Sequence, residues 1–128
     1  MHVERIDHLV LTVADIEQSV EFYSRVMGMQ RIEFGEGRIA LAFGTQKINL
    51  HQRGREFSPR AGQVQPGSAD LCFVIEEPVE RVLEELQVHG VDVIEGPVPR
   101  TGARGKIVSV YFRDPDQNLI EVCNYVND

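Results

Sequence analysis

The chain has 128 residues, of which 42% are hydrophobic and 26% are charged, and this composition suits one compact globular domain. We find no pattern typical of a signal peptide or of a membrane-spanning helix. The net charge of −7 argues against nucleic acid or an anionic membrane as the main partner.

The first half of the chain predicts one strand, one helix and three further strands. Residues 6–13 alternate between apolar and mixed positions, which is typical of a strand with one buried face. Asp15 follows as a natural helix N-cap, apolar residues then recur at helical spacing, and Gly28 closes the helix. Turns that contain glycine separate the remaining strands, which we expect over residues 30–34, 38–43 and 47–52.

The second half predicts the same order of elements. Residues 52–68 have no hydrophobic period, and we interpret them as a connection whose length makes a functional loop plausible. A helix opens at Glu77 with Pro78 in its first turn and ends at Gly90. Residues 114–118 have the composition of a tight turn. The strands of this half are expected over residues 69–75, 92–94, 107–112 and 119–126.

An internal repeat relates the two halves. A shift of 62 positions places His8 on Asp70, and it also superimposes the two helix openings and the two closing glycines. A repeat of this kind constrains the fold more strongly than a single motif does. We therefore predict an α+β fold of two tandem βαββ modules, about residues 1–57 and 66–128, within a single domain.

The two cysteines, Cys72 and Cys123, both lie inside apolar strand patterns. We interpret them as inert buried thiols rather than as a disulfide or a reactive pair. A reducing compartment follows, and we expect a cytoplasmic protein.

Basic residues are concentrated in two segments that contain few acids. Residues 52–68 hold only Glu56 as an acid, and residues 95–106 hold only Glu95. In an acidic protein such segments indicate capture of a small anionic molecule. The alternative is that both are simply solvated loops. The six basic residues are Arg53, Arg55, Arg60, Arg100, Arg104 and Lys106.

Polar side chains share one face of the predicted sheets. Because side chains alternate along a strand, the apolar positions should pack against the helix of the same module and the polar ones should face away from it. If the modules pair about a twofold axis, these donors converge on one site, and we interpret them as a metal site. The alternative is that each is an ordinary exposed or hydrogen-bonded residue. The donors on this face are His8, Asn49, His51, Asp70 and Glu121.

Two motifs carry a resemblance to a known family. Residues 6–15 (IDHLVLTVAD), followed by Phe22-Tyr23 and residues 27–29, resemble the opening of vicinal-oxygen-chelate proteins, the superfamily of glyoxalases, bleomycin resistance proteins and dioxygenases. Residues 111–121 (YFRDPDQNLIE) are similar to its closing motif. The runs at 47–51 and 95–103 are most similar to small glyoxalase-domain-containing proteins. The resemblance covers essentially the whole chain and implies a curved, eight-stranded mixed sheet around one divalent metal ion, often in a homodimer.

By position, the resemblance implies a set of metal ligands. His8 matches the first-strand histidine ligand and Glu121 the last-strand glutamate ligand. Asp70 stands where relatives usually have a second histidine, and Asn49 stands where glyoxalases often have a glutamate or glutamine. Asp70 or His51 would complete the shell around a Zn, Ni, Mn, Mg or Fe ion.

The resemblance favours a glyoxalase-like enzyme of the lactoylglutathione lyase type. Glu121 would then serve both as a metal ligand and as the base that moves a proton between adjacent carbons. The substrate would be a small anionic molecule, such as a glutathione adduct. Two alternatives remain open: an extradiol-type dioxygenase or thiol transferase, and a non-catalytic protein that binds a drug or metabolite. The residues expected to hold the substrate are Asn49, Arg53, Arg104, Lys106 and Tyr111.

Overall fold

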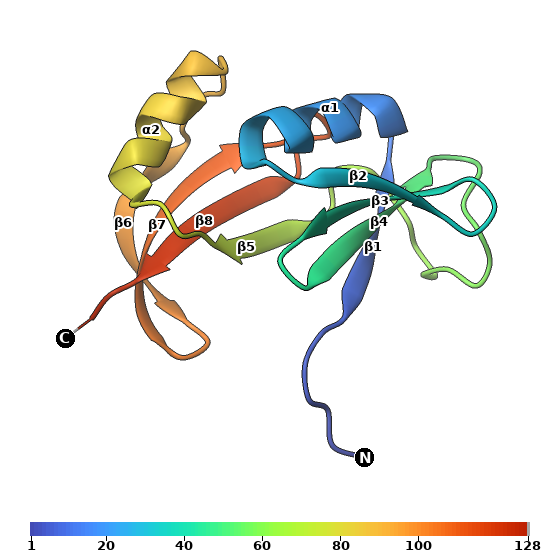
Figure 1. Ribbon diagram of the computed structural model, residues 1–128, viewed down its shortest axis with the longest axis horizontal. Helices are drawn as coiled ribbons and strands as arrows, with labels where there is room; N and C mark the ends of the chain where they lie inside the picture. The colour runs from blue at the N-terminus through green and yellow to red at the C-terminus, as the bar shows by residue number, and fades with distance from the viewer. Residues whose placement is uncertain (128) are drawn as a thin grey trace. The chain divides into compact units, whose positions relative to one another are not determined.

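The computed structural model describes residues 1–127, and the chain divides into two units between Gly67 and Ser68. Each unit contains a strand, a helix and three more strands, so the α+β class and the repeated βαββ order are confirmed (Figure 1). The first unit contains β1 (His8–Val13), α1 (Ile16–Met27), β2 (Gln30–Phe34), β3 (Arg38–Phe43) and β4 (Gln46–Gln52). The second contains β5 (Asp70–Val74), α2 (Val79–Val88), β6 (Glu95–Gly102), β7 (Gly105–Arg113) and β8 (Leu119–Tyr125).

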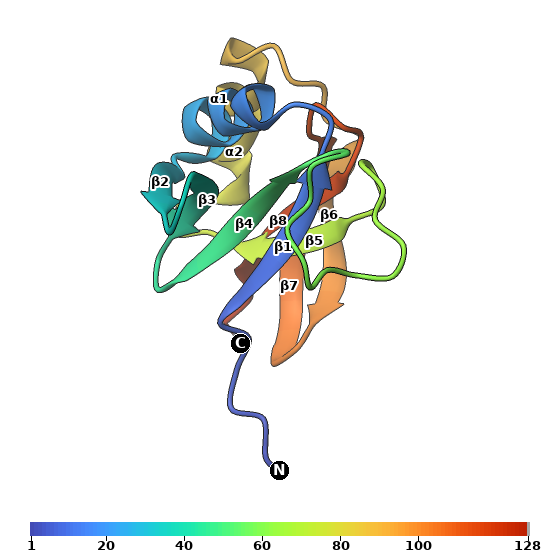
Figure 2. The same cartoon turned by 90° about the vertical axis from the view of Figure 1, so that its right-hand side faces the viewer.

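Each unit builds its own four-stranded mixed sheet. The strand order is β1-β4-β3-β2 in the first unit and β5-β8-β7-β6 in the second. In both, the first strand runs parallel to the last, and the remaining pairs are antiparallel. Figure 2 shows β1 beside β4 in this parallel arrangement. The last strand of each unit is therefore an interior strand, whereas the first strand lies at an edge.

One helix packs on one face of each sheet. In the first unit α1 contacts β2, β3 and β4, and the register pairs Ile39 with Leu50 and Leu41 with Ile48 on the covered face. In the second unit α2 contacts β7 and β8. The side chains at the centre of these packed layers are almost completely buried; they include Val13, Tyr23, Leu41, Ile48, Leu86, Val110, Phe112 and Ile120. None of the helices described within residues 1–127 is both long and apolar enough to cross a membrane.

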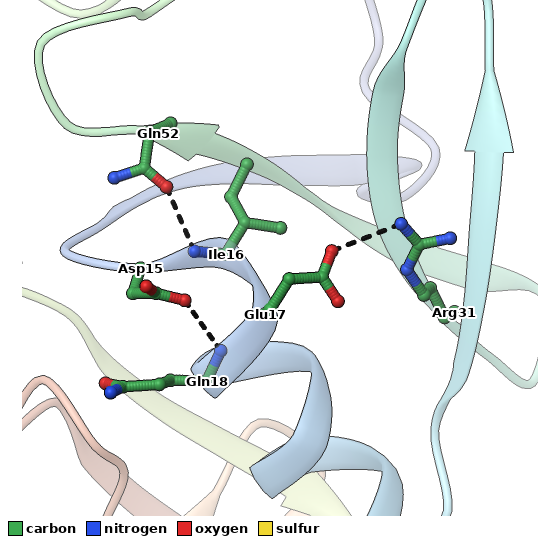
Figure 3. Close-up of polar contacts among 6 residues, drawn as sticks. All are labelled: Asp15, Ile16, Glu17, Gln18, Arg31 and Gln52. Atoms are coloured by element: carbon green, nitrogen blue, oxygen red, sulfur yellow. Dashed lines mark hydrogen bonds and ion pairs between the residues drawn. The ribbon is translucent and has the colours of Figure 1, made fainter.

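The ends of α1 follow the sequence prediction. Asp15 is the N-cap, and its carboxylate accepts a hydrogen bond from the backbone N–H of Gln18 at 2.9 Å (Figure 3). Gly28 ends the helix with a φ of 65°, a left-handed conformation that glycine adopts without a Cβ penalty. Glu17 in the first turn pairs with Arg31 of β2 at 3.2 Å, which ties the helix to the sheet.

The opening of α2 differs from the prediction by a small shift. We expected Glu77 to open this helix, but the N-cap position is Pro78, which has no side-chain acceptor, and the helix begins at Val79. An acceptor from elsewhere replaces the missing cap, since Asn124 Oδ1 accepts the N–H of Val79 at 2.9 Å. We expected the helix to end at Gly90, and it ends two residues earlier, at Val88. Gly90 has the left-handed φ of 70° that is typical of a glycine after a helix.

Both units fasten the start of the helix with an amide side chain from the last strand. In the first unit Gln52 accepts the N–H of Ile16 at 3.0 Å (Figure 3). The same side chain donates to the carbonyl of Ala14 at 2.6 Å. In the second unit Asn124 accepts from Val79 and also donates to the carbonyls of residues 75 and 77 at 3.1 and 2.9 Å. We call these two side chains the amide clamps. Each satisfies backbone groups that a helix start leaves without partners.

One strand was predicted in the wrong place. We expected a strand at 92–94 and a loop over 95–106, but the strand is β6, from Glu95 to Gly102, and a short turn leads into β7. Because the segment contains Pro97 and Pro99, its sequence does not have the pattern of a strand. Proline is tolerated here because β6 lies at the edge of its sheet and its pairing with β7 is interrupted by a bulge between Glu95 and Val98. At Gly96 a Cβ would overlap the backbone of Ser109 and Val110.

The tight turn between β7 and β8 is confirmed. The Asp114 carboxylate accepts hydrogen bonds from the backbone N–H groups of Asp116 and Asn118, both at 2.9 Å. The Asn118 side chain in turn accepts from the N–H of Ala69 at 2.8 Å, which anchors the segment before β5.

The expectation of two buried cysteines is wrong for one of them. Both thiols are free, and Cys123 is buried, but Cys72 is exposed because β5 is an edge strand. Their sulfur atoms lie 3.7 Å apart. Partial desolvation, the contact with Cys123 and the nearby charge of Glu121 raise the pKa of Cys72 to about 12. This exposed thiol is therefore protonated at neutral pH, as an inert cysteine is.

Replacing Asn124 by alanine should destabilise the chain by about 2 kcal/mol, because three backbone groups at the start of α2 lose their partner. Urea unfolding would measure the loss, with Asn127→Ala as an exposed control that should change stability by less than about 0.5 kcal/mol. Equal stability of Asn124→Ala and the parent would show that the clamp is dispensable.

Cys72 should react slowly in spite of its exposure. At pH 8 only about 1 in 10,000 of these thiols is ionised if the pKa is about 12. We expect iodoacetamide to alkylate Cys72 at least ~100-fold more slowly in the folded chain than in urea, where an ordinary pKa returns. Mass spectrometry of the peptide that contains Cys72 measures both rates, and equal rates would refute the predicted ionisation behaviour.

Candidate functional site

Strand alternation separates the polar residues of each sheet from its helix. In the first unit, Asn49 pairs with Ala40 between the helix-facing pairs, so both lie on the side away from α1. We call this side face A; its residues used below are His8, Phe34, Arg38, Ala40, Lys47, Asn49 and His51. The matching side of the second unit is face B; its residues used below are Asp70, Cys72, Arg100, Ser109, Tyr111, Glu121 and Cys123.

His51 is the most enclosed polar residue of face A. Its side chain is only 7% exposed, and its Nδ1 atom has no hydrogen-bond partner within residues 1–127. The ring of Phe57 packs edge-on against it, with the two ring centroids 5.6 Å apart. Desolvation lowers the pKa of His51, and the charge of Arg38 lowers this pKa further. His51 is therefore a neutral imidazole at pH 7, the form that can ligate a metal or accept a hydrogen bond.

Asn49 lies two residues before His51 on β4. Its Oδ1 atom is buried and also has no hydrogen-bond partner in the described chain, residues 1–127. Beside it, the Lys47 ammonium lies 3.6 Å from the centroid of the Phe34 ring. The two unsatisfied polar atoms and this cation belong to the same strand face, which is the composition of a binding surface rather than of a packed core.

His8 sits at the start of β1 and is exposed. Its Nδ1 atom lies 2.8 Å from the Asp7 carboxylate, and this hydrogen bond lowers the pKa of Asp7. A carboxylate on one ring nitrogen orients the imidazole and leaves Nε2 available to a ligand.

Glu121 occupies the middle of face B. The hydroxyl of the buried Ser109 donates to Glu121 Oε2 at 2.6 Å. The register places Tyr111 and Cys72 beside Glu121 on the two neighbouring strands. A single strong hydrogen bond thus fixes one carboxylate oxygen of Glu121.

Tyr111 links Glu121 to a cation that our site prediction omitted. The guanidinium of Arg100 donates to the Tyr111 hydroxyl at 3.0 Å and pairs with Glu95 at 3.3 Å. Desolvation raises the pKa of Tyr111 in spite of the opposing hydrogen bond from Arg100, so the phenol is protonated at neutral pH. Arg100 was assigned to a loop because the prolines of β6 concealed its strand, and Ser109 was overlooked although its alternation with Val110 placed it on the polar side.

The remaining predicted site residues are more dispersed. Asp70 is the exposed first residue of β5, and Arg53 is exposed just after β4. Arg104 lies in the turn between β6 and β7, where its guanidinium carbon is 5.0 Å from the Tyr125 ring centroid. Lys106 lies on β7 at a position that alternates away from face B, so the structure does not bring Lys106 to the side that carries Glu121.

The donor types suit a divalent cation, but they do not form a compact cluster. A neutral imidazole with an unpartnered buried nitrogen and a half-buried carboxylate are ordinary metal ligands. In the described residues, 1–127, no group of three or more His, Cys, Asp or Glu side chains has an arrangement that could hold an ion. The chemistry of His51 and Glu121 therefore fits a metal, without a preformed site.

Known proteins match this chain over nearly its whole length. Residues 5–122 match the model of the glyoxalase/bleomycin resistance protein/dioxygenase superfamily. Virulence protein STM3117 of Salmonella typhimurium is 53% identical over 98% of this chain and 88% of its own length. The glyoxalase domain-containing protein RDO1 of Mycosarcoma maydis is 54% identical over 98% of this chain and 70% of its own length.

Solved structures give the same result. An integron cassette protein from V. cholerae is 56% identical with a TM-score of 0.96, and the match covers 98% of both chains. Among matches of lower identity are Glyoxylase I 4 of Arabidopsis thaliana, at 27%, and a lactoylglutathione lyase structure from Agrobacterium tumefaciens, at 21% with a TM-score of 0.72. The antibiotic-binding protein TnmS3 of a Streptomyces species is 22% identical with a TM-score of 0.76. This chain therefore belongs to the glyoxalase/bleomycin resistance protein/dioxygenase superfamily.

Proposed function

We propose that this chain is a glyoxalase-like enzyme that isomerises a small anionic substrate with two adjacent oxygens, in the manner of a lactoylglutathione lyase. The observation that carries the proposal is the setting of Glu121, a half-buried carboxylate with one oxygen fixed by Ser109 and a protonated phenol beside it. The names of two lower-identity matches, a glyoxylase I and a lactoylglutathione lyase, support the same chemistry.

The proposal includes one divalent metal ion, of Zn, Ni, Mn, Mg or Fe. We propose His8 and Glu121 as ligands, with His51 or Asp70 completing the set. When bound, such a cation polarises a carbonyl oxygen and acidifies the proton on the neighbouring carbon. The support is chemical: His51 is neutral with an unpartnered nitrogen, and the hydrogen bond from His8 to Asp7 leaves its other nitrogen available.

The side chains then have separate roles in the isomerisation. The Glu121 carboxylate removes a proton from one carbon and returns it to the adjacent carbon. The hydroxyl proton passes from the oxygen of the first carbon to the carbonyl oxygen of the second, so the step is an isomerisation with no atom gained or lost. Ser109 positions the carboxylate by holding Oε2, which leaves Oε1 to accept the proton. Tyr111 stays protonated and donates a hydrogen bond to a substrate oxygen. The residues proposed to bind the remainder of the substrate are Asn49, Arg53 and Arg104, whereas Lys106, which faces the other side of β7, is no longer part of this set.

A non-catalytic function is the second candidate. It is favoured by the absence, within residues 1–127, of a three-residue metal cluster. The fold is shared with a structure titled as an antibiotic-binding protein. In that case the polar residues of face A, or those of face B, would only bind a small molecule. The cytoplasmic location, the homodimer and the glutathione adduct stay predictions.

Glu121→Gln should lower kcat for isomerisation of the methylglyoxal–glutathione hemithioacetal by at least ~100-fold, because the amide cannot accept the proton. The change keeps the side-chain shape and an acceptor for Ser109. Absorbance of the thioester product measures the rate, and Glu33→Gln on β2 is the matched control, which should retain full activity. An active Glu121→Gln enzyme would exclude Glu121 as the base.

Purification without chelators should give close to one divalent ion per chain by elemental analysis. His8→Ala should weaken metal affinity by about 10- to 100-fold, because a ligand is lost. Glu4→Gln, a change in an exposed acid near the same end of the chain, should leave metal content unchanged. A metal-free chain that still binds a small molecule would favour the non-catalytic candidate.

A further inference from the structure

Two cations on face A form no ion pair among residues 1–127. The ion pairs of this part of the chain engage other basic residues, and neither Arg38 nor Lys47 belongs to one. Both side chains are half-buried, and the nearest acid named for Lys47 is Asp7, whose pKa the Lys47 charge helps to lower. An added anion can therefore pair with both cations.

Aromatic rings support both cations without neutralising them. The Arg38 guanidinium carbon lies 4.3 Å from the centroid of the Phe57 ring, and the Lys47 ammonium lies 3.6 Å from that of Phe34. Phe34 on β2 is also the register partner of Arg38 on β3. Because the Lys47 ammonium lies over the Phe34 ring, Lys47 extends toward the part of the sheet that carries Arg38. A ring contact occupies the face of a guanidinium and leaves its N–H edge for hydrogen bonds.

Two buried polar atoms on the same face lack partners. His51 Nδ1 and Asn49 Oδ1 are both unsatisfied within residues 1–127, and His51 is more than nine-tenths buried. A buried polar atom without a hydrogen bond is costly and usually marks a place that a ligand or an ordered water fills. The register partners of Asn49 on this face are Ala40 and Val10, neither of which has a polar side chain to pair with the amide.

The local charge balance favours an anion near His51. Arg38 and Arg60 both act on His51 as positive charges, and Glu56 is the opposing acid. The Glu56 carboxylate is already engaged, since it accepts the N–H of Gly54 at 3.1 Å. Among residues 1–127, no carboxylate forms an ion pair with Arg38.

We propose that face A binds a small carboxylic acid that also carries a hydroxyl group. The carboxylate contacts Arg38 and Lys47, and the hydroxyl donates to Asn49 Oδ1. In this arrangement Asp70 rather than His51 completes the proposed metal set, which leaves His51 Nδ1 to contact the hydroxyl. This assignment names the substrate class of the proposed function, and it rests on that function only in identifying the ligand with the substrate. All the residues involved belong to the first unit.

Three probes of nearly equal size test the two parts of the assignment. Lactate has the carboxylate and the hydroxyl, propionate lacks the hydroxyl, and lactamide lacks the charge. We expect lactate to bind most tightly. Propionate should bind about fivefold more weakly because it lacks the neutral hydrogen bonds of the hydroxyl. Lactamide should bind at least about tenfold more weakly because it lacks the charged hydrogen bonds of the carboxylate. NMR titration that follows the Asn49 amide and the His51 imidazole measures affinity and location together.

Single variants connect each preference to a residue. Arg38→Gln should weaken the binding of lactate about tenfold and should not change the binding of lactamide. Asn49→Ala should remove the preference for lactate over propionate. Lys47→Gln should also weaken the binding of lactate, and it provides a second test if Arg38→Gln does not fold. Arg31→Gln is the control, because Arg31 pairs with Glu17 on the helix side. Equal binding of the three probes, or unchanged selectivity in these variants, would overturn the assignment.

The same experiment separates this inference from the proposed function. Glu33→Gln, a change on the helix side of β2, should bind lactate as the parent does. A parent chain that discriminates the probes without isomerase activity would support the inference and refute the lyase. An active lyase that binds the three probes equally would do the opposite.

Discussion

The structure depends on the two-residue alternation of side chains along strands that are covered by a helix on one side only. Where Leu50 and Ile48 turn toward α1, Asn49 and His51 must turn away from it, and the same holds for Ile120 and Glu121 in the second unit. A shift of one residue in register would bury the polar set against a helix. The amide clamps and the glycine-ended helices hold this arrangement in both copies.

The two copies share a scaffold but carry different chemistry. Face A combines two unpaired cations, two aromatic rings and unsatisfied polar atoms, which suits recognition of an anion. Face B centres on a carboxylate held by a buried hydroxyl, beside a phenol and two protonated thiols, which suits proton transfer. The two copies thus keep the same βαββ order and the same kind of amide clamp, and they differ in the side chains of their helix-free sides.

Much of the fold could be predicted because its signals are local. The strands at 30–34 and 38–43 and the caps at Asp15 and Gly28 depend on neighbouring residues alone. Edge strands are harder, since edge position is a property of the sheet: the prolines of β6 are tolerated at an edge. Cys72 combines an edge strand with the side that the helix does not cover. The site residues follow the same division. Alternation placed His51 and Glu121 on the helix-free sides, but the ring of Phe57 on Arg38 depends on a loop that has no period.

We propose that residues on the helix-free sides of the sheets bind the metal ion, and that Glu121 is both a metal ligand and the catalytic base. Crystals grown with Zn²⁺ and measured at the zinc absorption edge would test it most directly. The account predicts the strongest anomalous peak about 2.0–2.2 Å from a carboxylate oxygen of Glu121, with a histidine nitrogen at a similar distance. A strongest peak on the α1 or α2 side, at acids that the helices expose, would contradict it.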